Sequence, residues 1–175
     1  MASVTYKNQP AINKTKGNVP LAGNSHVYTV SKKLWHDNIE DVIQDLFIGT
    51  TLHACCGKSQ LGDVRLDLDP ANSPDIICDA ANMKGVIDDN QFDTVLCDPP
   101  YNGNFQWNHN LLAELSRVAS QRIIFQHWFI PANPNGLYKK AQEKFELTDV
   151  LVWQPKTYFG RVNVISVFDR INDMD

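Results

Sequence analysis

The hydrophobic pattern along the chain begins with a polar stretch and a helical segment. Residues 1–30 carry scattered Asn, Lys, Pro and Gly without periodicity, which predicts an extended N-terminal arm. The segment 31–47 then shows helical spacing, with apolar residues at Leu34, Trp35, Ile39, Val42, Ile43 and Leu46. Ser31 is a suitable N-cap and Gly49 a suitable stop, so we expect one helix over 31–47.

After Gly49 the pattern changes to short apolar runs, which are typical of buried strands. These runs are 51–56 (TLHACC), 63–69 (DVRLDLD), 75–78 (DIIC), 92–97 (FDTVLC), 122–128 (RIIFQHW), 147–154 (LTDVLVWQ) and 162–169 (VNVISVFD). Helices are predicted at 105–119 and 136–145. Apolar strands alternating with helices or loops favour an α/β fold with a mainly parallel sheet covered on both faces. The last two strands predict an antiparallel hairpin.

Composition and length support one globular unit. The chain has 175 residues, 43% of them hydrophobic, which is enough for a core of ordinary size. No repeat or linker interrupts it, so we expect a single domain over 31–175. No run of 18 apolar residues and no hydrophobic leader is present, so we predict a cytoplasmic protein without a membrane partner.

Charge and cysteine content narrow the function classes. The net charge is −4 and the isoelectric point is near 5.7, which argues against a broad basic face for gripping long nucleic acid. A local patch can still bind it. The four cysteines, Cys55, Cys56, Cys78 and Cys97, form no C-x-x-C pair, so free thiols are expected.

Polar groups follow several of the predicted strands, where an open parallel sheet binds its ligands. Gly57 after the first of these strands allows a tight turn. Asp67 and Asp69 end the next strand, where a carboxylate can accept hydrogen bonds from ribose hydroxyls. Asp79 follows the third strand and suits the exocyclic amine of an adenine.

The stretch FDTVLCDPPYNG, residues 92–103, carries the strongest signal. Proline cannot donate to a sheet ladder, so Asp98-Pro99-Pro100-Tyr101 must lie beyond the strand end. Each proline also restricts the residue before it. The result is a stiff loop that presents a carboxylate, backbone carbonyls and an aromatic ring, which indicates a site.

Taken together, these strand ends resemble the motif series of class I S-adenosylmethionine-dependent methyltransferases. CDPPY is similar to the D-P-P-Y motif of the amino-methyltransferases that modify adenine N6 in DNA, and the resemblance runs from about Thr51 to Asp169. It implies a Rossmann-like seven-stranded sheet with a reversed final hairpin. It also implies S-adenosylmethionine as cofactor, held by Cys56, Gly57, Asp67, Asp69, Asp79, Ala80 and Asp98.

The same resemblance assigns catalysis to Asp98, Pro99, Pro100 and Tyr101. The lone pair of an exocyclic amine is delocalised into the base. Hydrogen bonds to the Asp98 carboxylate and the Pro99 carbonyl would localise it, while Tyr101 stacks on the base. A base in duplex DNA must first be flipped out. Positioning and electrostatics then carry the reaction, and no metal is expected.

The chain also departs from the family pattern. Ten positions separate Gly57 from Asp67, which leaves no room for the usual helix, and the G-x-G of many relatives is missing. Lys58, Ser59 or the N-terminal arm would then contact the methionine carboxylate. No target-recognition domain fits between the motifs. Substrate contacts are therefore predicted from two loops, at Phe105, Trp107, Lys156, Tyr158 and Arg161.

Several alternatives stay open. DNA is preferred over RNA as the partner, with adenine N6 or guanine N2 of RNA as the runner-up. A third hypothesis is a cofactor-binding, non-catalytic subunit that positions a partner enzyme. The chain could also form an oligomer or bind a partner subunit. Asp67 and Asp69 also fit solvated edge positions. His127, Trp107 and Trp153 fit either the core or a pocket. Strand alternation places Cys97 opposite Asp98, which disfavours a cysteine nucleophile.

Overall fold

The computed structural model describes residues 32–34, 39–100, 109–127, 141, 143–153 and 163–171. The arm 1–30 lies outside these ranges, and so does most of the helix predicted at 136–145. The part of the chain that is described contains no helix of the length and apolarity required to cross a membrane.

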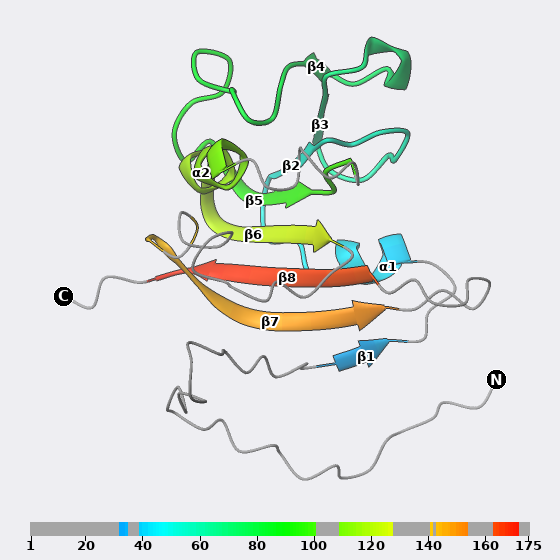
Figure 1. Ribbon diagram of the computed structural model, residues 1–175, viewed down its shortest axis with the longest axis vertical. Helices are drawn as coiled ribbons and strands as arrows, with labels where there is room; N and C mark the ends of the chain where they lie inside the picture. Colours follow the sequence, from blue (N-terminus) through cyan, green and yellow to red (C-terminus); the bar gives the residue numbers. More distant parts are fainter. Residues whose placement is uncertain are drawn as a thin grey trace, which may run out of the picture.

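One sheet organises the described residues (Figure 1). Its strands are β1 (Lys32–Leu34), β2 (Thr51–Ala54), β3 (Val64–Asp67), β4 (Ile76–Ile77), β5 (Phe92–Cys97), β6 (Ala119–His127), β7 (Phe145–Trp153) and β8 (Asn163–Arg170). The spatial order is β1-β7-β8-β6-β5-β2-β3-β4. Only β8 runs against its neighbours in this sheet, being antiparallel to both β6 and β7. The mainly parallel sheet and the reversed C-terminal hairpin are both confirmed.

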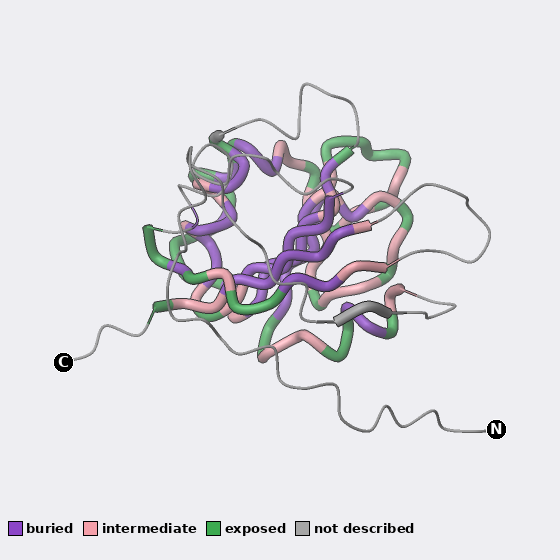
Figure 2. The backbone as a smooth tube through the Cα atoms, turned by 60° about the horizontal axis from the view of Figure 1, so that its bottom comes forward, coloured by how far each residue is buried: buried purple, intermediate pink, exposed green. Residues whose placement is uncertain are grey.

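Two helices cover opposite faces of this sheet. In α2 (His109–Val118), apolar side chains recur with helical spacing and pack into the larger core cluster at Leu111, Leu112, Leu115 and Val118. In α1 (Ile39–Gln44), Val42 and Ile43 pack into a second cluster. Along β5, Val95 faces the first cluster and its neighbour Leu96 the second, which is the alternation of a strand buried on both faces. Figure 2 shows the buried backbone running through the central strands.

The helix predicted over 31–47 is wrong at its start. Residues 32–34 form the edge strand β1, parallel to β7, with Lys32 beside Leu151 and Leu34 beside Trp153. Among the described residues of this segment, Ile39–Gln44 is helical. Leu34 fits the helical period as well as a strand, and pairing with the open edge of β7 decides between them. The sheet therefore has eight strands, the seven predicted ones and β1.

Two other boundaries move because strands begin earlier than the apolar runs indicate. The helix predicted to end at 119 gives way to β6 at Ala119, and Phe145, predicted as the end of a helix, opens β7. Ser120 and Gln121 are polar but bond to Asp93 across the sheet. Cross-strand partners thus extend β6 beyond its apolar segment.

The β2–β3 connection is short, as the spacing of Gly57 and Asp67 predicts. Parallel neighbours are usually joined by a crossover of about a dozen or more residues, commonly a helix. Here residues 55–63 make the connection without one. The chain turns at Gly57, where φ is +53°, and at Gly62, where φ is +89°. It then returns to the sheet, where the Asp63 amide donates to the Thr51 carbonyl at 3.0 Å.

Candidate active site

The candidate site residues lie where the order in which strands are added to the sheet reverses. From β2 the chain adds β3 and β4 on one side and then returns to add β5 on the other. All four strands are parallel, so their carboxyl ends lie at one edge. A crevice outside such a switch point is where open α/β sheets bind ligands.

Asp67, at the end of β3, is an acceptor held by backbone amides. Its Oδ2 accepts from the Gly57 amide and its Oδ1 from the Asp69 amide, each at 2.8 Å. Partial burial acts to raise the pKa of Asp67, but these bonds and one from the Asn72 side chain outweigh it, so the pKa lies below its ordinary value. The carboxylate is therefore ionised at neutral pH. Four groups of the chain hydrogen-bond to it: the amides of Gly57, Leu68 and Asp69 and the Asn72 side chain.

Gly57 provides the open face of the turn after β2. Its left-handed φ is one that L side chains rarely adopt, and a Cβ built there would meet nothing within 4 Å. The neighbouring Cys56 is buried, and its amide donates to the Leu66 carbonyl at 3.1 Å. Burial raises the pKa of the Cys56 thiol. The turn thus exposes backbone to which a ligand can come close.

Asp79 and Ala80 follow β4 in a tight turn. The Asp79 Oδ1 accepts from the Ala81 amide at 2.9 Å, and its carbonyl accepts from Asn82 at 2.8 Å. Ala80 is buried, while Asp79 is half-buried. This turn is tied to α2 through Glu114, which accepts from the Met83 amide at 2.7 Å. The Asp79 carboxylate keeps acceptor capacity at the edge shared with Asp67.

Asp98 lies directly past the end of β5. Its amide donates to the carbonyl of Ala54, the last residue of β2, at 3.4 Å. Pro99 is buried and Pro100 exposed. The start of the predicted catalytic motif is therefore next to the turn that carries Gly57.

Asp69 stabilises a short helical turn next to β3. It caps the 3₁₀ helix η1 (Pro70–Asn72), with its Oδ1 accepting from the Ala71 amide at 2.9 Å. Its assignment to the cofactor stays a prediction. Tyr101, Phe105, Trp107, Lys156, Tyr158 and Arg161 lie outside the described residues, and their roles stay predictions as well.

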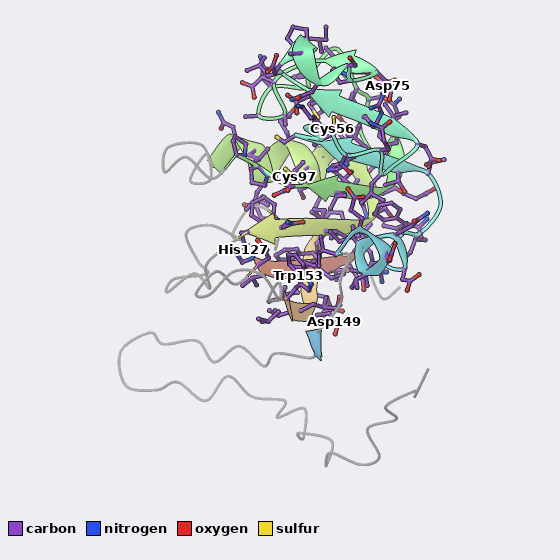
Figure 3. The ribbon with its side chains drawn as sticks, turned by 90° about the vertical axis from the view of Figure 1, so that its right-hand side faces the viewer. Cys56, Asp75, Cys97, His127, Asp149 and Trp153 are labelled. Carbon is purple, nitrogen blue, oxygen red and sulfur yellow. The ribbon has the colours of Figure 1, made fainter. Side chains whose placement is uncertain are left out.

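Two of the side chains that fitted either core or pocket, His127 and Trp153, lie in the core (Figure 3). His127 is fully buried, and its Nε2 lies 2.9 Å from the Ser166 hydroxyl. Trp153 packs against the second cluster. Cys97 is fully buried in the first cluster. Burial and a hydrogen bond with the Cys55 thiol raise its pKa, so it remains a protonated core thiol and a poor nucleophile.

The sequence pattern did not identify four residues beside these groups. Asn72 donates to Asp67, and Glu40 on α1 accepts from the Ser59 hydroxyl at 2.7 Å. Leu68 and Ile77 are 65% and 62% exposed, and Ile77 is the β4 partner of Asp67 in the register. Large apolar residues next to a strand-end acid were the available signal for these two. The two polar contacts join segments whose spacing gives no such signal.

Comparison with known proteins supports the fold through structure. The sequence matches no protein-family model and no curated protein. The protein PH1948 of Pyrococcus horikoshii, provisionally named an RNA methyltransferase, is similar with a TM-score of 0.58 at 14% identity, over 78% of this chain and 80% of that one. The 16S rRNA (adenine(1408)-N(1))-methyltransferase of Catenulisporales acidiphilia, a W203A mutant, gives 0.54 at 9% identity, over 89% and 98%.

A third similar structure is the 1,6-didemethyltoxoflavin-N1-methyltransferase of Burkholderia thailandensis, which holds its substrate and S-adenosylhomocysteine. Its TM-score is 0.52 at 12% identity, over 71% of this chain and 72% of that one. The chain has the class I methyltransferase fold. Within this fold, the described residues place Gly57, Asp67, Asp79 and Asp98 at one edge, and the β2–β3 connection contains no helix.

Proposed function

We propose that the protein is an S-adenosylmethionine-dependent methyltransferase acting on an exocyclic amine of a nucleobase, with adenine N6 in DNA as the first candidate. The observation that carries the proposal is the position of Asp98-Pro99-Pro100. These residues follow β5, and the Asp98 amide is bonded to the end of β2 beside the Gly57 turn. The groups that would accept hydrogen bonds from a substrate amine therefore lie next to the edge that would bind the nucleoside part of the cofactor.

The residues at this edge fit such a cofactor. The open space at Gly57 admits a ligand against the backbone, and Asp67 is an ionised acceptor suited to ribose hydroxyls. Asp79 would accept from the adenine amine, beside the buried Ala80. The exposed side chains of Leu68 and Ile77 offer apolar surface for a purine ring. When bound, S-adenosylmethionine supplies a methyl group activated by a sulfonium.

The chain's own groups would act on the acceptor amine. The Asp98 carboxylate and the Pro99 carbonyl each accept one N–H of the amine, which turns its lone pair out of the ring plane and orients it for attack. The carboxylate also stabilises the positive charge that develops on the nitrogen and can take the proton that the amine loses. Tyr101 is proposed to stack on the base.

RNA is the second candidate substrate, and two neighbours favour it. The Catenulisporales acidiphilia protein is named as an rRNA adenine methyltransferase, and PH1948 is provisionally named an RNA methyltransferase. Both are under 25% identical to this chain, so they support the candidate through fold alone.

The deciding experiment uses isotope-labelled S-adenosylmethionine with mixed-sequence DNA and, separately, RNA. Each polymer is digested to nucleosides and analysed by mass spectrometry. We expect labelled N6-methyldeoxyadenosine from DNA. Label in methyladenosine or N2-methylguanosine from RNA would favour the second candidate. Cofactor binding without label in either polymer would contradict both and favour a subunit that requires a partner.

Replacing Asp98 tests the mechanism. We expect Asp98→Ala to lower turnover about 100-fold or more, because the amine loses its charged acceptor, and to weaken affinity for S-adenosylhomocysteine by a much smaller factor. Asp149→Ala is the matched control, since Asp149 is an exposed carboxylate on β7. Methylation by the Asp98 variant at a near-normal rate would contradict the mechanism.

A further inference from the structure

The β2–β3 connection is held against the sheet by three side chains. We call residues 57–62 the return loop. Its start is fixed by the Gly57 amide on Asp67, and its middle by the Ser59 hydroxyl on Glu40 of α1. Its end is fixed by His53, whose Nδ1 lies 3.3 Å from the Leu61 carbonyl. These anchors replace the helix that would normally fix such a connection.

His53 lies directly beneath the end of the return loop. It is 3% exposed, and a Cβ built on Gly62 would come within 3.2 Å of the His53 Cβ. A carbonyl can only accept, so Nδ1 carries the proton and the ring is the neutral tautomer. Its Nε2 is then a bare acceptor, buried and without a partner. Such an acceptor destabilises the fold, so overall stability does not account for a histidine here.

The return loop has room to move on its other side. A cavity of about 550 Å³ lies between the loop and the region around α1, lined at the loop by Gln60, Leu61 and Gly62, and by Glu40 and Thr51 among others. A loop that borders a cavity lacks packing on that side, so its position depends on the hydrogen bonds that hold it elsewhere. Loss of the His53 bond would release residues 60–62 and leave the return loop and its Gly57 turn held by the Asp67 and Glu40 bonds alone.

We propose that His53 is a positioning residue for cofactor binding, which holds the return loop and thereby the Gly57 turn through the bond from its Nδ1 to the Leu61 carbonyl. This inference rests on the proposed function. Burial lowers the pKa of His53 to about 4, against the opposing effect of the Leu61 bond and of the charges on Glu40 and Asp67. The ring is therefore neutral across the physiological range.

Three variants separate the roles of the two ring nitrogens. His53→Asn retains an N–H near Nδ1, His53→Gln retains a polar group near Nε2 only, and His53→Leu retains neither. Affinity for S-adenosylhomocysteine is measured by calorimetry. Loop opening is measured by hydrogen exchange of a peptide covering 55–63, and Tm is measured without ligand.

We expect the Asn variant to bind within about threefold of the native protein and the Gln and Leu variants to bind at least about tenfold more weakly. Exchange in 55–63 should rise for Gln and Leu before any ligand is added. The Tm of the Leu variant should stay equal or rise, because the unpartnered Nε2 is gone.

Three outcomes would overturn the inference. One is equal affinity and equal exchange in all variants. Another is that binding falls only in proportion to Tm, which would indicate a merely structural role. The third is retention of binding by Gln with loss by Asn, which would assign the function to Nε2. Failure of the native protein to bind S-adenosylhomocysteine would overturn the proposed function as well, and so distinguishes the two.

Discussion

The imidazole of His53 occupies surroundings that disfavour its charged form. Burial lowers its pKa from 6.5 to about 4, although Glu40 and Asp67 act in the opposite direction and Arg65 acts with burial. The unfolded chain therefore binds a proton more readily than the folded one between these values. The stability that depends on a neutral His53 is complete above pH 6.5 and is lost as the pH falls toward 4.

We expect the free energy of unfolding to fall by about 2–3 kcal/mol between pH 7 and about pH 4.5 through this residue, at about 1.4 kcal/mol per pKa unit. Urea unfolding of the native protein and of His53→Asn checks this, because subtraction removes the other histidines. Measurements stay above the range where Asp93, with a pKa lowered to about 2, begins to protonate. Parallel pH curves for the two proteins would contradict the prediction.

Individual site residues could be predicted to the extent that their chemistry is local. Asp98 and Gly57 follow apolar strands directly, so their place at a strand end was readable from the sequence. The capping role of Asp69 and the bond from Asn72 to Asp67 depend on η1, a single turn without an apolar period. Such contacts form only when the chain has folded, and no pattern of residue types predicts them.

At the scale of elements, two glycines bound β2 with nearly the same backbone geometry. Gly49 has φ +55° and Gly57 has φ +53°. A Cβ on Gly49 would collide with Asp93, whereas one on Gly57 would meet nothing. Asp93 is itself fixed by bonds from Thr50, Ser120 and Gln121. An alanine substitution therefore tests a steric collision at Gly49 and access of a ligand to the backbone at Gly57.

We expect Gly57→Ala to cost about 1–2 kcal/mol of stability, the price of a left-handed L residue, and to weaken S-adenosylhomocysteine binding because its methyl group enters the open face. Gly49→Ala should lose clearly more stability and keep its affinity. Urea unfolding and calorimetry on both variants check this. Equal effects of the two substitutions would show that Gly57 serves only the turn.

Helices and strands could be predicted where one hydrophobic period dominated the segment. The prediction failed where pairing with a neighbouring strand determined the structure. β5 was predicted with its observed bounds, Phe92–Cys97, because its apolar residues are followed at once by Asp98-Pro99-Pro100, which ends a strand. β1 was not predicted, because Lys32-Lys33-Leu34 has no strand pattern of its own and depends on the edge of β7. The polar start of β6 depends in the same way on Asp93. Tertiary partners override local preference at such edges.

At the scale of the whole molecule, the arginines of the described residues are bonded to other side chains of the chain. Arginines in the described ranges bond as follows: Arg65 to Asp75, Arg117 to Glu114 and Asp89, Arg122 to Asp169, and Arg170 to Asn90. With a net charge of −4, this arrangement is unlike a face built to neutralise many phosphates. Nucleic acid would be held through few ionic contacts.

We therefore expect weak salt dependence of nucleic-acid binding. Each phosphate contact contributes about −0.9 to the slope of log K against log salt concentration on duplex DNA, so a slope of about −3 or shallower is predicted. Fluorescence anisotropy with a labelled duplex over a series of KCl concentrations measures it. A slope steeper than about −6 would mean a broad basic surface and contradict the prediction.

The short β2–β3 connection has a consequence for chain entropy. The bonds that shape this corner join residues close in sequence, with separations of 8 for His53–Leu61, 10 for Gly57–Asp67 and 12 for Thr51–Asp63. The Arg122–Asp169 pair between β6 and β8 spans 47. Closing a loop of about 10 residues costs about 1.4 kcal/mol less than closing one of 47, by the logarithmic dependence on loop length. The β2–β3 connection therefore demands less entropy from the unfolded chain than the β6–β8 contact does.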